Sequence, residues 1–216
     1  MKTKNLLKEA IIWLIIALPL GYLAYVWKDL PAQIPIHYGI NGQPDNWTSP
    51  QGLIWLTLSM TLGVYLLMCI IPLIDPKQKI TKMGTKYFAV KLLMTAFMSA
   101  VAFILIYTSV KTEIKTEKLI AILMGFLMVV FGNYMPSFKP NYFIGVRTPW
   151  TLESEPNWQA THRFAGWTWV TTGLFVFLLA LFVNKHFVYQ LSILLIMLAA
   201  LAPIVYSFIY YLRNKN

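Results

Sequence analysis

The chain has 216 residues, of which 58% are hydrophobic and 12% are charged, and its formal net charge is +10. Soluble domains carry about 25% charged residues, so this composition excludes an ordinary soluble protein and leaves little chain for a separate soluble domain. The positive charge does not indicate nucleic-acid binding, because the basic residues cluster at the ends of apolar runs, where they mark the cytoplasmic side of a membrane and meet anionic lipid.

Cys69 is the only cysteine and lies within an apolar run. An intrachain disulfide and a cysteine-based metal site are therefore excluded. A lone cysteine in such a run is most often a small core residue.

Long apolar runs make up most of the chain. A helix needs about 20 residues to cross a hydrocarbon core of roughly 30 Å, and six runs reach that length. They lie at about 7–27, 53–74, 87–110, 119–138, 164–183 and 187–212. We therefore predict an all-α membrane protein, a six-transmembrane-helix bundle with a small outer cap and an ordered cytoplasmic segment at the membrane interface.

The first run follows a positive start, as a signal peptide does, but it is longer than one. Its apolar part extends about 18 residues from Ala10, beyond the roughly 7–15 residues of a signal-peptide core, and no clear small-residue cleavage site follows. We expect it to remain as a membrane span.

The link at 28–50 is predicted to form the outer cap. Pro31 and Pro35 oppose a helix, and apolar side chains alternate at 34, 36 and 38 as in a strand. Turn signals follow at Asn41-Gly42 and at 44–46. We expect a compact hairpin with Trp47 at the depth of the lipid headgroups.

Two residues of this cap, His37 and Asp45, have side chains that can bind a metal or move a proton. Two potential ligands without a third are weak support for a metal site. We therefore interpret His37 as a surface histidine and predict no metal.

The distribution of lysines and arginines predicts the orientation. Six spans put both termini on one side, and that side carries twelve basic residues against five on the other, which indicates cytoplasmic termini in the plasma membrane. Lys91, inside the third span, is expected to reach back to the interface. The eight acidic residues lie in links or at span ends, which argues against a proton-coupled transporter.

The stretch at 132–163, which we call the signature segment, separates the fourth and fifth runs. It mixes glycine, proline and asparagine with many aromatic residues. Disordered linkers are poor in aromatics, so we expect an ordered structure on the cytoplasmic side. The fourth run is short unless it includes 132–134, which places Asn133 near the inner interface, where its amide can bond freed carbonyls or a neighbouring helix.

A helix is predicted to begin within this segment. Ser154 is the expected N-cap, with Glu155 and Pro156 in the first turn. Continued into the fifth span, this helix places Trp158 and His162 on one face.

Two interpretations of the signature segment remain open. In one, Lys139, Arg147 and Arg163 form an inner-face pocket for a lipid phosphate, an acidic peptide or a carboxylate, with Arg147 as the main donor and His162 positioning or exchanging a proton. In the other, the aromatics lie at headgroup depth, the basic residues contact ordinary lipid, and His162 bonds to backbone.

Two groups of residues resemble known bacterial sequences. The signature segment contains Gly132-Asn133-Tyr134-Met135-Pro136, then Lys139-Pro140-Asn141-Tyr142-Phe143-Ile144-Gly145-Val146-Arg147-Thr148-Pro149-Trp150-Thr151-Leu152, then Trp158 and Thr161-His162-Arg163. It resembles the SdpI family, bacterial multi-pass membrane immunity proteins of the sporulation-delaying toxin system. The cap contains Leu30-Pro31, Ile34-Pro35-Ile36-His37-Tyr38-Gly39 and Gly42-Gln43-Pro44-Asp45, and resembles an uncharacterised domain that often precedes that family's region.

The resemblance implies how the chain is divided and what it does. We expect a two-span unit at 1–86 with its cap at 28–50, followed by an SdpI-like four-span unit at 87–216. The implied protein sits in the bacterial plasma (inner) membrane and protects its cell from a secreted antimicrobial peptide toxin. It is also implied to be a receptor that sequesters a small cytoplasmic repressor. No catalytic residue set and no cofactor come with the family.

The candidate residues for ligand or partner binding lie in the signature segment and in the cap. In the segment they are Asn133, Lys139, Asn141, Arg147, Thr148, Trp150, Trp158, His162 and Arg163, and in the cap His37, Asp45 and Trp47.

The alternative hypothesis is a membrane enzyme or binding protein acting on an anionic lipid through Lys139, Arg147 and Arg163. Against an enzyme, the sequence has no evident carboxylate pair, metal set or nucleophile–base motif. A small transporter is a third hypothesis, but it would be expected to show an internal repeat or an intramembrane charge.

Overall fold

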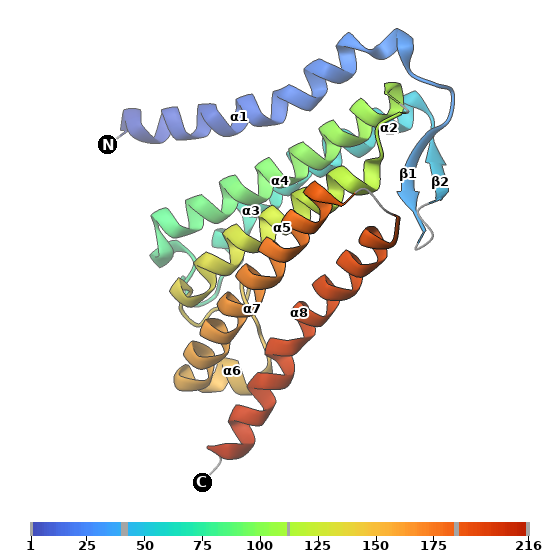
Figure 1. Cartoon of the computed structure of the whole chain (residues 1–216). Helices are drawn as coiled ribbons and strands as arrows, with labels where there is room; N and C mark the ends of the chain where they lie inside the picture. The colour runs from blue at the N-terminus through green and yellow to red at the C-terminus, as the bar shows by residue number, and fades with distance from the viewer. Residues whose placement is uncertain (1, 40–42, 112, 184–185, 215–216) are drawn as a thin grey trace. The chain divides into compact units, whose positions relative to one another are not determined.

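The computed structural model describes residues 2–39, 43–111, 113–183 and 186–214 (Figure 1). Its helices are α1 (Lys2–Tyr25), η1 (Trp27–Asp29), α2 (Pro50–Leu58), η2 (Ser59–Gly63), α3 (Val64–Ile74), η3 (Thr81–Met83), α4 (Thr85–Val110), α5 (Thr116–Tyr134), η4 (Met135–Ser137), α6 (Pro149–Glu153), α7 (Glu155–Phe182) and α8 (His186–Arg213). The strands are β1 (Ile34–Tyr38) and β2 (Pro44–Thr48). The predicted turn at Asn41-Gly42 lies outside the described residues, as do Lys185 and Lys215 of the charge distribution.

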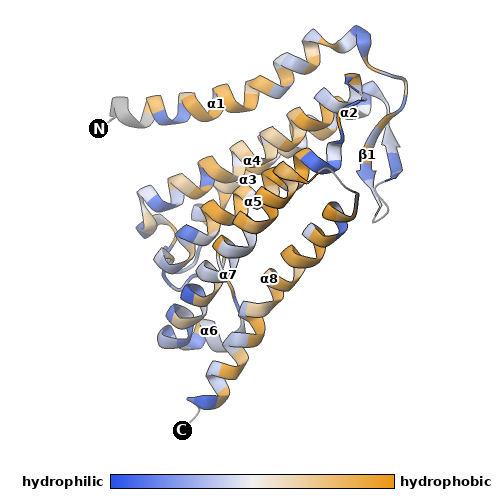
Figure 2. Ribbon diagram, in the orientation of Figure 1, coloured by the Kyte–Doolittle hydropathy of each residue, from blue (hydrophilic) through white to orange (hydrophobic). Residues whose placement is uncertain are grey.

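The predicted six spans are confirmed. Among the described residues, six helices are long and apolar enough to cross a membrane: Leu6–Tyr25, Pro50–Ile74, Thr85–Val110, Thr116–Ser137, Glu155–Phe182 and Phe187–Arg213. Figure 2 shows apolar residues along these helices and hydrophilic ones in the hairpin and the connecting segments. The second span contains the single turn of π-helix η2, between α2 and α3.

The chain divides into two compact units. The first comprises Met1–Leu73 and Thr85–Ile120, and the second comprises Ile74–Gly84 and Ala121–Asn216. The first unit therefore contains α4 together with α1, the hairpin, α2 and α3. The second unit contains the short link after α3 together with α6, α7, α8 and most of α5. The predicted division of the sequence at 86/87 stays a prediction.

The first unit contains the predicted hairpin. β1 and β2 pair antiparallel, with Ile34 opposite Thr48, and the register shifts on both sides of His37. Ile34 is fully buried in a cluster formed by residues of α1, β1, α2 and α4. The Tyr38 hydroxyl lies 3.0 Å from Thr116 Oγ1 at the start of α5. Ile34, through its apolar side chain, and Tyr38, through its hydroxyl, therefore help to hold the hairpin against the helices.

A charged pair inside the first unit corrects the expectation for Lys91. Instead of reaching to the interface, its ammonium lies 2.6 Å from Glu9 Oε1, and the Tyr65 hydroxyl donates to Glu9 Oε2 at 2.9 Å. The Lys91 side chain is only 11% exposed, and Glu9 lies within the first span. Glu9 is the fourth residue of that span and so stands at a span end, and pairing with Lys91 lowers the cost of placing either charge there.

In the second unit, glycines bring α5 and α7 into backbone contact. A Cβ added at Gly173 would lie 2.7 Å from the Gly125 carbonyl, and one added at Gly166 would lie 2.9 Å from the Gly132 carbonyl. Small residues allow this close approach of membrane helices. Trp169 of α7, which packs against Phe131 of α5, donates its indole N–H to the Ala199 carbonyl of α8 at 3.0 Å. These contacts position the signature segment between the ends of three helices.

Candidate functional site

The signature segment begins where α5 tightens into η4. Pro136 stands in η4, and the chain becomes extended at Phe138. The Phe138 carbonyl accepts a hydrogen bond of 2.7 Å from the indole of Trp158, a fully buried residue of α7. Trp158 therefore ties the exit of α5 to the start of α7, as an aromatic with a polar edge can do when it is buried.

Asn141 organises the loop that follows. Its amide nitrogen donates to the carbonyls of Lys139 at 2.9 Å and Ile144 at 3.0 Å. Its amide oxygen accepts from the backbone of Phe143 and Ile144 at 2.8 and 2.7 Å. Asn141 is 2% exposed, and these bonds use the hydrogen-bonding groups of its amide within the loop itself. Its role in the structure is thus to fix the backbone.

His162 of α7 closes the loop against the helix. Its Nε2 accepts from the Val146 backbone N–H at 3.1 Å, and its Nδ1 lies 2.8 Å from the Trp158 carbonyl. A backbone N–H can only donate and a carbonyl can only accept, so the proton is on Nδ1 and the ring is neutral. The ring is fully buried and stacks on Trp158 with centroids 4.0 Å apart. His162 is therefore a packing and hydrogen-bonding residue in this structure.

Gly145 makes the approach of that ring possible. Its φ is +110°, and a Cβ there would lie 2.2 Å from His162 Nε2. Both the backbone conformation and the space require glycine. The loop and α7 are consequently fitted to each other at one point.

The end of the segment is anchored to α8 through Ser207. The Trp150 indole donates to Ser207 Oγ at 2.7 Å, and the Asn157 amide donates to the Ser207 carbonyl at 3.0 Å. Thr148 Oγ1 lies 3.3 Å from Ser207 Oγ and also caps α6, where Thr148 and Thr151 form a capping box. Thr148 and Trp150 are thus structural contacts of α8.

The predicted start of α7 is confirmed. The Ser154 side chain caps the helix by accepting from the Asn157 backbone at 3.3 Å, and Pro156 lies in the first turn. On the buried face of α7, Thr161 donates to the Asn157 amide oxygen at 2.9 Å.

The three cations of the segment do not converge on His162. Lys139, Arg147 and Arg163 are exposed, whereas His162 is buried. The Arg147 guanidinium donates to the Tyr142 carbonyl of its own loop. Lys77, from the link after α3, lies over the Tyr142 ring at 5.2 Å. None of these three cations lies beside His162. Backbone groups also bond to both of its ring nitrogens, so neither nitrogen is available for the predicted proton exchange.

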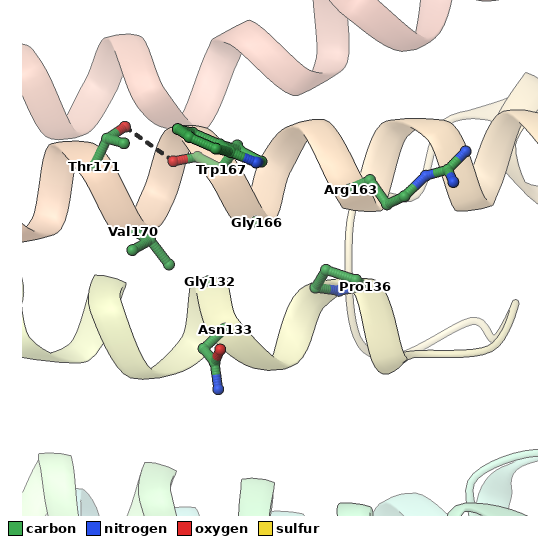
Figure 3. A pocket seen from close by; sticks show the side chains of 8 residues that line it. All are labelled: Gly132, Asn133, Pro136, Arg163, Gly166, Trp167, Val170 and Thr171. Carbon is green, nitrogen blue, oxygen red and sulfur yellow. Dashed lines mark hydrogen bonds between the residues drawn. The ribbon is translucent and has the colours of Figure 1, made fainter.

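Arg163 lines a groove between α5 and α7, which we call the Arg163 groove (Figure 3). Its volume is about 630 Å³, and it is lined by Gly132, Asn133, Pro136, Arg163, Gly166, Trp167, Val170 and Thr171. Of the residues predicted to bind a ligand, it brings together Asn133 and Arg163. The other seven of the segment serve the loop or its anchors, or stand exposed outside the groove.

The predicted cap residues lie on the hairpin. His37 Nδ1 is 2.5 Å from Asp45 Oδ1 on the exposed side, and Trp47 is 48% exposed. Among the described residues, no three histidine, cysteine, aspartate or glutamate side chains gather as metal ligands. The binding roles assigned to the segment and the cap stay predictions.

Sequence reasoning missed Ser207 and Lys77. Ser207 lies deep in an apolar run of α8, and only the fold brings it to Thr148 and Trp150. Lys77 belongs to a short basic link that resembles an ordinary solvated turn, yet the Asp75 carboxylate accepts the Ile80 N–H at 2.8 Å and orders that link. A serine within an apolar run is the one signal that could have pointed to Ser207.

Comparison with known proteins confirms the predicted resemblance. The SdpI/YfhL protein family matches residues 137–210, and a domain of unknown function, DUF1648, matches residues 14–62. The chain is 27% identical over 207 residues to "Immunity protein SdpI" of Bacillus subtilis (strain 168), an alignment that covers 95% of this chain and 97% of that protein. No solved structure matches the chain.

Proposed function

We propose that this chain, which matches the SdpI/YfhL protein family at residues 137–210 and DUF1648 at residues 14–62, is an immunity protein that protects its cell from a secreted antimicrobial peptide toxin. The observation that carries the proposal is the extent of the match to an immunity protein, which covers nearly the whole of both chains. A match of that extent includes the spans, the hairpin and the signature segment together.

We propose a binding function without catalysis. In the signature segment, the groups best suited to acid–base chemistry are already engaged, since both His162 nitrogens bond to backbone. Asn141 and Trp158 are likewise committed to the loop. What remains available is an exposed set of cations, Lys139, Arg147 and Arg163, which suits recognition of an anionic surface.

We propose that the protein lies in the plasma membrane with both termini in the cytoplasm, because basic residues favour that side. In this orientation the hairpin faces outward, where a secreted peptide arrives, and the exposed part of the signature segment faces a cytoplasmic regulator. The ordered loop at Asn141 supports the second role, since Lys139 and Arg147 are exposed on a backbone that the Asn141 amide fixes.

Gene deletion tests the proposal. Cells without the gene should be killed by at least one peptide of a panel of secreted membrane-active peptides that wild-type cells survive, and a plasmid copy should restore survival. The control is a plasmid copy that carries Gly145→Val, which cannot fit the His162 contact and should not restore it. Equal survival of deleted and wild-type cells across the panel would contradict an immunity function.

A further inference from the structure

The Arg163 groove is a depression in the face of the α5–α7 pair. Its floor is low because Gly132 and Gly166 have no side chains and their backbones meet there. Figure 3 shows Arg163, Trp167 and Val170 along α7, Asn133 on α5, and Pro136 on η4, which follows α5. A volume of about 630 Å³ is within the range of roughly 300–1,000 Å³ that is usual for small-molecule sites.

Of the polar side chains that line the groove, the Thr171 hydroxyl donates to the Trp167 carbonyl at 2.9 Å, whereas three others have no partner within the part of the protein that the structure describes. Among the described residues, no hydrogen bond, ion pair or ring contact engages the Arg163 guanidinium, the Asn133 amide or the Trp167 indole nitrogen. The neighbouring Asn141 and Trp158, by contrast, are fully hydrogen-bonded. The groove therefore differs from the rest of the segment in offering free donors.

These free donors lie within helices that cross the membrane. Asn133 belongs to the span Thr116–Ser137, and Arg163 and Trp167 belong to the span Glu155–Phe182. A lipid headgroup at the membrane interface can accept hydrogen bonds from such donors.

The groove is polar at one end and apolar at the other. Arg163 lies eight residues into α7, or about 12 Å along the helix axis, and Asn133 lies in the last turn of α5. Both are close to the ends of their spans, where lipid phosphates lie. Trp167 and Val170 follow one and two turns deeper, and Trp167 is 76% exposed. The end of the groove at Arg163 is therefore charged, and the end at Trp167 and Val170 is apolar.

We propose that the Arg163 groove binds one anionic phospholipid. Its phosphate accepts hydrogen bonds from the Arg163 guanidinium, a two-pronged donor, and Asn133 of α5 is the other polar residue of the lining. One acyl chain lies along Trp167 and Val170 over the glycine floor. A free phosphate would leave that apolar wall empty, and a zwitterionic lipid brings a second, positive charge to Arg163. This site does not depend on the immunity function proposed above.

Lipid retention by the purified full-length protein tests the site. The protein is placed in nanodiscs with equal amounts of phosphatidylglycerol and phosphatidylcholine, and the retained lipid is measured by native mass spectrometry. Phosphatidylglycerol should be retained in preference to phosphatidylcholine. Arg163→Gln should reduce this preference by roughly ten- to hundredfold, as expected for loss of one charge-assisted hydrogen bond.

Arg213→Gln is the matched control, since Arg213 is an exposed arginine at the end of α8 and is distant in the sequence from the groove residues. It should leave the preference unchanged. Asn133→Asp, an exposed and nearly isosteric change, should lower the preference by repelling the phosphate. The melting temperature of each variant shows that the fold is retained.

Three results would overturn the proposal. They are equal retention of the two lipids by the wild-type protein, equal losses in Arg163→Gln and Arg213→Gln, and displacement of the lipid by inorganic phosphate alone. The second would indicate general surface charge, and the third a phosphate site without a lipid.

Discussion

At the scale of single residues, the signature segment is defined by which polar groups are used and which are free. His162, Asn141 and Trp158 hold the backbone of the loop, whereas Arg163 and Asn133 face a groove. The identity of these five residues did not predict which would bond to the loop backbone and which would line the groove. A histidine looks equally fit for a ligand site and for a backbone contact until its partners are known.

The contact between Gly145 and His162 yields the first prediction. Gly145→Ala introduces a Cβ 2.2 Å from His162 Nε2 at a residue with φ +110°, so it combines backbone strain with overpacking. We expect a loss of about 2–4 kcal/mol in the free energy of unfolding, seen as a lower melting temperature in detergent.

Gly84→Ala is the control for that prediction. Gly84 has φ +55°, yet an added Cβ would meet nothing within 4 Å. This variant therefore isolates the conformational cost, about 1–3 kcal/mol. If the two variants melted at the same temperature, the close fit between the loop and His162 would be refuted.

The pair formed by Glu9 and Lys91 yields the second prediction. Glu9→Gln leaves the Lys91 ammonium, 11% exposed, without its partner. Because the Glu9 side chain is 38% exposed, the expected loss is about 1–2 kcal/mol. The double variant Glu9→Gln with Lys91→Met should recover most of the loss, since it also removes the unpaired charge. Thermal unfolding measures both, and a double variant less stable than Glu9→Gln would contradict this account.

At the scale of elements, α5 and α7 form an antiparallel pair held by glycines. Gly125 meets Gly173, and Gly132 meets Gly166, and the two glycines of each helix are seven positions apart. This spacing puts them on one helical face. The repeat is present in the sequence, but only the pairing of α5 with α7 shows that the glycines of the two helices meet.

The glycine contact yields the third prediction. Gly173→Ala places a methyl group 2.7 Å from the Gly125 carbonyl, and backbone cannot move aside as a flexible side chain can. The helices must separate, so we expect a loss of about 1–3 kcal/mol and a lower melting temperature. Gly21→Ala in α1, where an added Cβ meets nothing within 4 Å, should be neutral or stabilising. The glycine contact would be disproved if the two substitutions had the same effect.

At the scale of the whole molecule, hydropathy alone predicted the six spans, because the length of an apolar run is a local property of the sequence. Local rules also predicted the hairpin and the Ser154 cap. They did not predict the Glu9–Lys91 pair or the meeting of Ser207 with Trp150. Those residues are far apart in the chain, so only the packing of helices brings them together.

The proposed orientation yields the fourth prediction. With Cys69 replaced by alanine, a cysteine introduced at the exposed hairpin residue Asn46 should react with an impermeant thiol reagent in intact cells. A cysteine introduced at the exposed Lys139 should react only after the membrane is opened. Labelling of the cysteine at 139 in intact cells would reverse the proposed topology.

Transfer of protection into a sensitive host tests the proposed immunity function most directly. A strain that is killed by a secreted membrane-active peptide and has no immunity gene of its own is given this chain or an empty vector, and survivors are counted over time. Across a panel of such peptides, the account predicts survival of at least one peptide in cells that contain the chain and not in cells with the vector. Identical killing of the two strains by every peptide, with the protein present in the membrane, would contradict it.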